Sequence, residues 1–133
     1  MSYCPAEVLL GHCSYGIGVD IWGLGCVFAE MFIKDVLFYD ENETKLIYKI
    51  FKKVGTPDFL LWEETKIFCP NNFKFPKFTK TGFSYIKKIN QDFDDIALDL
   101  LEKMLNPNPT KRPNCKIIKS HPFFKDYLNN LNK

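Results

Sequence analysis

The chain has 133 residues, of which 46% are hydrophobic and 26% are charged, and its formal net charge is +2. This balance is typical of one globular domain and excludes a disordered chain. So small a net charge gives no electrostatic argument for nucleic acid or an acidic membrane, and we expect neither as a partner.

Cysteine usage indicates an intracellular protein. The number of cysteines is odd and no Cys-x-x-Cys pair occurs, so the pattern predicts reduced thiols rather than disulfides or a zinc site. No secretory leader pattern is visible either. The most apolar stretch, residues 17–38, is interrupted by charged residues and is better interpreted as a buried helix than as a membrane span.

Two helices are predicted in the first third of the chain. Residues 5–10 favour a short helix that Gly11 ends, and residues 12–18 form a loop. Residues 19–33 predict a core helix, because apolar residues cover nearly every face of it. Those expected to be buried are Val19, Ile21, Trp22, Leu24, Val27, Phe28, Met31 and Phe32. Gly23 and Gly25 weaken this helix unless another backbone packs closely there.

A capping-box pattern, Asp40 followed by Glu43, predicts the start of the next helix. Its apolar residues recur at helical spacing up to Val54, and Gly55 ends it. Four lysines fall on its other face: Lys45, Lys49, Lys52 and Lys53. With the basic, aromatic stretch 73–88 they raise the alternative of a nucleic-acid surface, but a solvated or partner-facing surface is the better interpretation.

The second half predicts one long irregular segment and two more helices. Residues 58–91 show no sustained period, and we expect their aromatics to hold them against the helices: Trp62, Phe68, Phe73, Phe75, Phe78, Phe83 and Tyr85. Asp94 or Asp95 caps an amphipathic helix with the apolar stripe Ile96, Ala97, Leu100, Leu101, Met104 and Leu105. Asn114 caps a last short helix that stops before Pro122, and residues 129–133 form a frayed tail. The predicted fold class is mainly α.

Three segments carry a family resemblance. Residues 3–11 read Tyr-Cys-Pro-Ala-Glu-Val-Leu-Leu-Gly, residues 19–31 contain Asp-Ile-Trp-Gly, and residues 108–113 read Asn-Pro-Thr-Lys-Arg-Pro, with His-Pro-Phe-Phe following at 121–124. In this order they resemble the C-terminal lobe of protein kinases, from the end of the activation segment onward. The spacing of residues 46–62 is similar to cyclin-dependent-kinase-like serine/threonine kinases of the CMGC group. We expect a partial kinase domain over 1–128.

The resemblance implies roles for individual residues. Glu7 and Arg112 match the ion pair that ties the end of the activation segment to the helices behind it. Asp20 matches the carboxylate that accepts hydrogen bonds from the catalytic-loop backbone. At the edge of the substrate pocket, Cys4 stands where relatives carry Arg, and Pro5 with Ala6 inverts the usual Ala-Pro, which puts proline-directed specificity in question. His121 is expected to be structural.

The groups that perform phosphoryl transfer in this family have no match here. That chemistry requires a glycine-rich loop, a strand lysine, an Asp base with an Asn for metal, and the Asp of Asp-Phe-Gly. No Gly-x-Gly-x-x-Gly, His-Arg-Asp or Asp-Phe-Gly sequence occurs. We therefore expect no catalytic, cofactor-binding or metal-binding residue. ATP and Mg²⁺ belong to the intact family, and we expect this chain, from a truncated or split gene, to be inactive alone.

Three functional interpretations remain open. The first is a fragment of a cyclin-dependent-kinase-like kinase, which needs the other half of the domain, a cyclin-like activator or a docking protein, and whose intact relatives act on protein substrates. The second is a non-catalytic module that binds a partner, and the third is an unrelated small helical domain. The family implies a nuclear or cytoplasmic location. Because the helix at 19–33 is apolar all round, we expect the lone chain to expose a large apolar patch and to aggregate.

Overall fold

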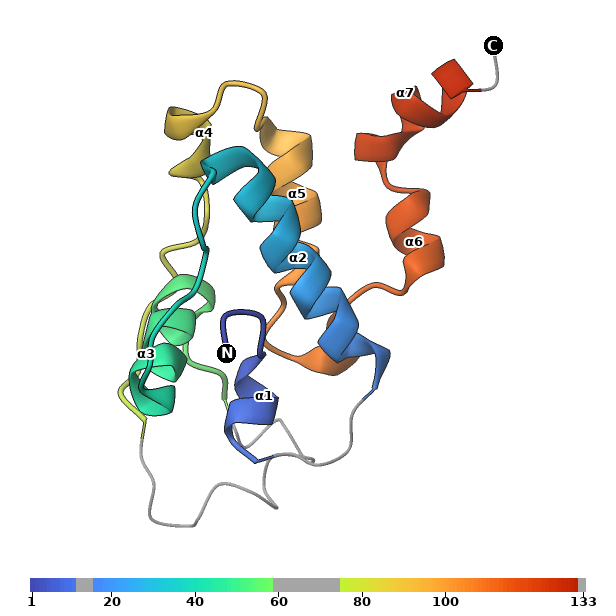
Figure 1. Ribbon diagram of the computed structural model, residues 1–133. Helices are drawn as coiled ribbons and strands as arrows, with labels where there is room; N and C mark the ends of the chain where they lie inside the picture. The colour runs from blue at the N-terminus through green and yellow to red at the C-terminus, as the bar shows by residue number, and fades with distance from the viewer. Residues whose placement is uncertain (12–15, 59–74, 132–133) are drawn as a thin grey trace.

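The computed structural model describes residues 1–11, 16–58 and 75–131, and within these ranges it is helical, with no strand (Figure 1). The mainly α fold class is thereby confirmed. The elements in chain order are α1 (Ala6–Leu9), α2 (Ile17–Ile33), α3 (Glu43–Val54), α4 (Ile86–Ile89), α5 (Asp95–Met104), the 3₁₀ turn η2 (Pro109–Lys111), α6 (Cys115–Lys119) and α7 (Pro122–Leu131).

Helix α2 runs through the middle of the fold, with α5 behind it in the view of Figure 1. On the side of α2 that faces the protein, Trp22, Cys26 and Ala29 are completely buried. The Trp22 ring stacks on Phe38, with ring centroids 5.8 Å apart. Gly25 allows the end of α5 to come close, since a Cβ there would lie 2.8 Å from Leu105 Cδ2. Close packing is therefore found at Gly25 but not at Gly23, and side chains rather than the expected backbone make it.

Helix α3 begins at a different cap from the one predicted. The side chain of Asn42 accepts a hydrogen bond from the Lys45 backbone N–H at 3.0 Å, so Asn42 is the N-cap. Asp40 instead accepts from the backbone N–H of Asn42 and pairs with Lys49 at 3.0 Å. Both residues suit an N-cap, and the one nearer to the first apolar residue of the helix is the one used. The caps at Asp94 and Asn114 are confirmed.

The segment after α3 is held along that helix, as the aromatic pattern predicts. Phe75 packs edge-on against Phe51, with centroids 5.5 Å apart, and Phe78 lies 5.9 Å from Tyr48. The Thr56 hydroxyl donates to the Pro76 carbonyl at 2.7 Å. Phe83 is fully buried. The predicted contacts of Trp62, Phe68 and Phe73 lie outside the described residues.

Two predictions for the second half of the chain are wrong in detail. Helix α4 interrupts the segment expected to be irregular. Helix α6 stops at Lys119, before Pro122, as expected, but it is not the last helix. Helix α7 begins at Pro122 and continues to Leu131, so residues 129–131 are helical rather than frayed. His121 precedes the proline, and its Nδ1 accepts the Phe123 backbone N–H at 3.2 Å. Proline is well tolerated in the first turn of a helix, so Pro122 starts α7.

Candidate docking site

Arg112 ties the start of the chain to its C-terminal part. Its guanidinium grips Glu7 with two parallel hydrogen bonds, Nη1 to Oε1 at 2.6 Å and Nη2 to Oε2 at 3.0 Å. Glu7 is 2% exposed and Arg112 is 7% exposed. The structure thus brings together the two residues that the resemblance pairs. This fork-to-fork geometry is the strongest form of a side-chain ion pair.

The remaining donors of Arg112 are also used. Nε donates to the Asn106 carbonyl at 2.8 Å, while Nη1 and Nη2 donate to the carbonyls of Gly18 and Pro107. The guanidinium carbon lies 5.0 Å from the centre of the Trp22 ring, a cation–π contact. Arg112 therefore joins α1, the start of α2 and the loop after α5, and it fixes the base of α2.

The opposite side of α2 carries an uncovered apolar stripe. Leu24 is 45% exposed, Val27 is 47% exposed and Met31 is 62% exposed, although all three were expected to be buried. They are spaced by three and four residues, so they lie on one side of the helix. The prediction that they are core residues is wrong for this chain, because no described element covers that side. The exposed patch expected for a lone chain is found here. We call Ile17, Asp20, Leu24, Val27 and Met31 the α2 face.

Asp20 lies within the α2 face, one turn before Leu24. Its side chain is exposed, and no described residue pairs with it by a hydrogen bond or an ion pair. As an acidic residue in the first turn it is favoured by the helix dipole. Among the described residues, the expected catalytic-loop anchor is therefore exposed and lies beside exposed apolar side chains of α2.

After the Asp20 carboxylate, the indole N–H of Trp22 is the second polar group of α2 without a partner among the described residues. Its side chain is completely buried, and its Nε1–H finds no acceptor among the described residues. An unpaired buried donor costs about 1–3 kcal/mol. Sequence reasoning treats Trp22 only as packing, since a donor that lacks a partner shows no signal in the sequence.

The two residues expected at the edge of a substrate pocket lie at the start of α1. Pro5 is buried and is the N-cap of the helix, in extended conformation, and Cys4 before it is half-buried. Burial raises the pKa of the Cys4 thiol. Nothing in these positions tests a role at a substrate pocket, so that role stays a prediction.

Cysteine reactivity in the folded chain should follow exposure. Cys26 is fully buried, and burial raises the pKa of its thiol to about 12, whereas Cys115 is exposed. Because the thiolate is the reactive form, iodoacetamide at neutral pH should modify Cys115 in the native chain and Cys26 only after unfolding. Peptide mapping by mass spectrometry, with a sample in denaturant as the control, measures both. Equal native labelling of the two thiols would contradict the packing of α2.

His121 has a structural environment. Since its Nδ1 accepts a backbone N–H, its Nε2 is the donor to Asp99 Oδ2, at 2.8 Å. Asp99 also accepts from Lys103 at 2.6 Å, and the hydrogen bonds from Lys103 and then His121 lower the pKa of its carboxyl. This cluster links α5 to α7. Sequence reasoning missed Asp99, whose only signal was its spacing of four residues from Lys103.

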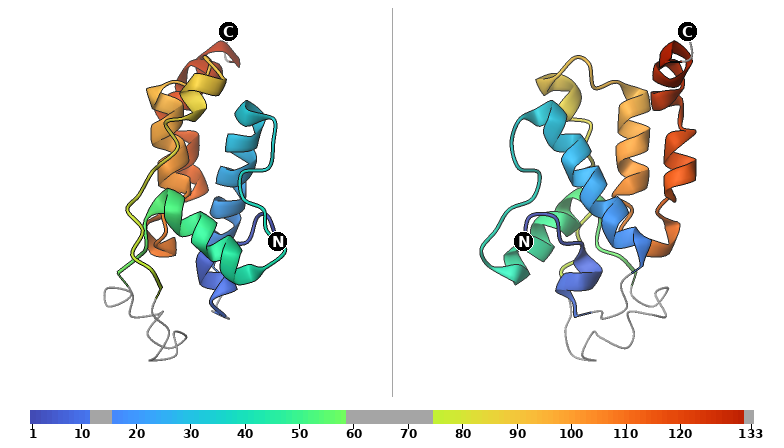
Figure 2. Two further views of the ribbon diagram at one scale, coloured as in Figure 1. Left: turned by 90° about the vertical axis from the view of Figure 1, so that its left-hand side faces the viewer. Right: turned by 45° about the vertical axis from the view of Figure 1, so that its right-hand side comes forward.

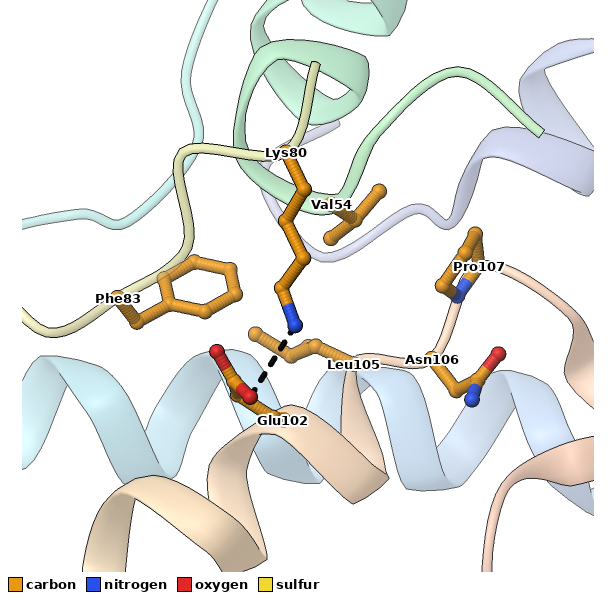
Figure 3. A pocket seen from close by; sticks show the side chains of 7 residues that line it. All are labelled: Val54, Lys80, Phe83, Glu102, Leu105, Asn106 and Pro107. Carbon is orange, nitrogen blue, oxygen red and sulfur yellow. Dashed lines mark ion pairs between the residues drawn. The ribbon is translucent and has the colours of Figure 1, made fainter. Parts of the chain in front are cut away.

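A small pocket lies between the end of α3 and the end of α5 (Figure 3). The side chain of Lys80 reaches across it to Glu102, with Nζ and Oε2 3.1 Å apart. The volume of this pocket, about 60 Å³, is far below the roughly 300–1,000 Å³ of pockets that bind small organic ligands. The pocket is therefore no nucleotide site.

Other kinds of site are not found in the described residues. No group of three or more potential metal ligands comes together in the ranges 1–11, 16–58 and 75–131. Among the helices of the same ranges, none is both long enough and apolar enough to span a bilayer. The α2 face, which includes Asp20, is an exposed apolar surface of the kind that binds another polypeptide.

The comparisons with known proteins agree with this geometry. The model of the protein kinase domain matches residues 1–124. Cyclin-dependent kinase B2-1 of Oryza sativa subsp. japonica is 39% identical over 124 residues, which cover 93% of this chain and 37% of the relative. The chain thus spans little more than a third of that relative, and the alternative of an unrelated helical domain is excluded. The chain belongs to the protein kinase domain family.

Proposed function

We propose that the chain is the helical C-terminal lobe portion of a cyclin-dependent-kinase-like serine/threonine kinase, and that its α2 face binds the polypeptide that carries the nucleotide-binding and catalytic groups. The observation that carries this proposal is the exposed stripe of Leu24, Val27 and Met31 with the carboxylate of Asp20 beside it, for which the described residues offer neither a cover nor a partner. In the intact family the position of Asp20 receives backbone N–H groups of the catalytic loop. An exposed acceptor set in an apolar surface suits such a partner.

The residues present indicate which roles this chain has and which roles belong to the rest of a kinase domain. The buried Glu7–Arg112 pair holds the end of the activation segment on the helices, while the rest of a kinase domain would bind ATP and Mg²⁺ and supply the catalytic Asp. Protein phosphorylation, a cyclin-like activator and a nuclear or cytoplasmic location come to this chain only through the kinase family. We propose the partial kinase domain over residues 1–128.

The chain alone should not bind nucleotide. Phosphoryl transfer depends on positioned cations and a phosphate-binding loop, and none of the corresponding motifs is in the sequence. Isothermal titration of Mg-ATP into the purified chain should give no binding heat, and the melting temperature should not move with Mg-ATP. The intact rice relative, titrated in parallel, is the positive control. Saturable ATP binding by the chain would contradict the inactive assignment.

The docking role is tested with the part of the rice relative that precedes its matched segment. This polypeptide, co-expressed with the chain, should co-purify with it. The Asp20→Leu variant should retain less of it, because it lacks the acceptor for backbone N–H groups. Asp92→Leu, at an exposed carboxylate outside the α2 face, is the matched control and should behave as the unsubstituted chain does. No co-purification, or equal loss with both variants, would refute docking through this face.

The alternative of a non-catalytic binding module uses the same surface. One observation supports it. The buried hydrophobic residues of the described chain, from Ala6 to Ile118, form a single core cluster by themselves. A module would bind its partner without any gain of phosphoryl transfer. Assay of transfer in the co-purified complex distinguishes the two.

A further inference from the structure

We propose that Thr56 is a phosphorylation site for a proline-directed protein kinase, and that its phosphorylation frees residues 75–78 from α3. This inference goes beyond the proposed function and does not depend on it, since it concerns the modification of this chain by a separate kinase. It rests on one side chain, whose hydroxyl lies where the end of α3 meets the segment that packs along that helix.

The sequence around Thr56 is that of a substrate for such a kinase. Thr56 and Pro57 form the only Thr-Pro or Ser-Pro pair in the sequence. The proline ring fixes the backbone of Pro57 and keeps the residue before it out of the helical region. Residues 55–58 accordingly lie outside the helices, directly after α3. A non-helical segment that proline already restrains loses less conformational entropy when an enzyme binds it.

Thr56 lies close enough to the surface to be modified. Thr56 and Pro57 are half-buried, and Asp58 after them is exposed. On the other side of the contact, Pro76 and Lys77 are exposed as well. Contacts at the surface open locally at a much lower free energy than the core does. A modifying enzyme therefore gains access to the hydroxyl without unfolding the chain.

The Thr56 hydroxyl holds the facing segment by two hydrogen bonds. It donates to the Pro76 carbonyl at 2.7 Å and accepts the Phe78 backbone N–H at 2.8 Å. The Thr56 backbone N–H also donates to the Phe78 carbonyl at 3.1 Å. Figure 1 and the left panel of Figure 2 show this segment, in yellow-green, beside α3. One threonine thus joins two stretches that are 20 and 22 residues apart in the sequence.

Phosphorylation is incompatible with this contact. Thr56 Oγ1 attacks the γ-phosphorus of ATP, the bond from that phosphorus to the β–γ bridging oxygen breaks, ADP leaves, and the hydroxyl proton passes to the base of the modifying kinase. The product has no proton to donate to the Pro76 carbonyl, and a phosphorus atom takes the place of the hydrogen in a gap of 2.7 Å. It also sets a charge of about −1.5 to −2 beside that carbonyl oxygen. Lys77 is exposed, and an ion pair of an exposed lysine with the phosphate is too weak to hold the segment.

The residues that would be freed cover aromatic side chains of α3. Phe75 packs edge-on against Phe51, and Phe78 lies against Tyr48, with the Lys52 ammonium 5.5 Å from the centre of the Phe78 ring. Release takes Phe75 and Phe78 off these rings. Modification of Thr56 therefore controls how far the aromatic side of α3 is covered.

A second set of hydrogen bonds confines the release to residues 75–78. The Thr81 backbone N–H donates to the Lys52 carbonyl at 3.1 Å, and the Gly82 N–H donates to the Lys53 carbonyl at 2.9 Å. The Thr81 hydroxyl also donates to the Lys52 carbonyl, at 2.8 Å. None of these bonds uses Thr56, so the chain from Thr81 onward stays on the end of α3 after the modification.

Incubation of the full chain with ATP, Mg²⁺ and a purified, active proline-directed kinase tests the site, with the phosphate located by peptide mapping in a mass spectrometer. We expect a single phosphate, on Thr56, and none on Thr79 or Thr81, which no proline follows. Thr56→Ala should abolish incorporation, Thr56→Ser should retain it, and Pro57→Ala should lose most of it. Thr79→Ala, at an exposed threonine of the facing segment, is the matched control and should incorporate phosphate as the unsubstituted chain does.

Amide hydrogen exchange, resolved by residue with NMR, tests the release. Phosphorylation should speed exchange at the amides of Thr56 and Phe78, and it should leave the amides of Thr81 and Gly82 as protected as before. The last two also show that the chain is folded when the kinase acts. Without any kinase, Thr56→Ala should speed exchange at Phe78, because the hydroxyl that accepts this N–H is gone, while Thr56→Ser should not.

A chain with protected Thr81 and Gly82 amides that takes no phosphate on Thr56 would overturn the proposal. So would incorporation that Pro57→Ala leaves unchanged, incorporation that requires unprotected Thr81 and Gly82 amides, or a phosphorylated chain whose Phe78 amide exchanges no faster. These results do not bear on the docking role of the α2 face, which co-purification with the preceding part of the rice relative decides separately.

Discussion

Replacing Arg112 with alanine should lower the free energy of unfolding of the chain by roughly 3–5 kcal/mol, because the substitution leaves Glu7 as a buried carboxylate without its counter-ion. The carbonyls of Asn106, Gly18 and Pro107 lose their donors at the same time. Since a small domain is stable by only about 5–15 kcal/mol, much of the variant should be unfolded under mild denaturant. Urea unfolding followed by circular dichroism, at one fixed chain concentration, measures the change.

The neighbouring residue supplies the control for this experiment. Lys111 is exposed, and Lys111→Ala should change the free energy of unfolding by no more than about 0.5 kcal/mol. Arg112→Lys should be intermediate, since it keeps the charge and loses the fork geometry. A loss of less than about 1 kcal/mol for Arg112→Ala would mean that the pair does not hold the fold together.

Gly23 and Gly25, two of the three glycines of α2, should respond in opposite directions to alanine. At Gly25 the new Cβ would lie 2.8 Å from Leu105 Cδ2 and 3.0 Å from Met104 Cβ, so α5 must move away. Subtracting the gain in helix propensity from the cost of overpacking, we expect Gly25→Ala to lose up to roughly 2 kcal/mol of stability. A Cβ at Gly23 meets nothing within 4 Å, and Gly23→Ala should gain up to about 1 kcal/mol.

The pair of variants is its own control, since both make the same chemical change two residues apart in one helix. Thermal unfolding of the two, side by side with the unsubstituted chain, should show melting temperatures on either side of it. Melting temperatures that move together would show that α5 does not pack on α2 at Gly25.

Local signals in the sequence predict much of this fold. The caps at Asp94 and Asn114 follow from short polar side chains placed just before apolar runs, and Gly55 ends α3 with a φ of 88°. Physical ambiguity explains the misses. Asn42 and Asp40 both suit a cap, and a proline such as Pro122 is compatible with either the end of one helix or the first turn of the next.

The candidate site needed more than local pattern. Sequence alone shows that α2 is apolar all round, but not which side the rest of the chain covers. Burial depends on tertiary neighbours: Met104 and Leu105 approach Gly25, while Leu24, Val27 and Met31 stay exposed. Ile96 likewise belongs to a predicted apolar stripe and is 45% exposed. The Glu7–Arg112 pairing, 105 residues apart in sequence, was reached through the family resemblance and not through spacing.

Phosphoryl transfer by a reconstituted complex is the most direct test of the account. The chain, the preceding part of the rice relative, and their co-purified complex would each be incubated with radiolabelled ATP, Mg²⁺ and a generic protein substrate such as histone H1. The account predicts no transfer by either part alone and measurable transfer by the complex, reduced by Asp20→Leu and not by Asp92→Leu. Transfer by the chain alone, or a stable complex that remains inactive, would contradict it.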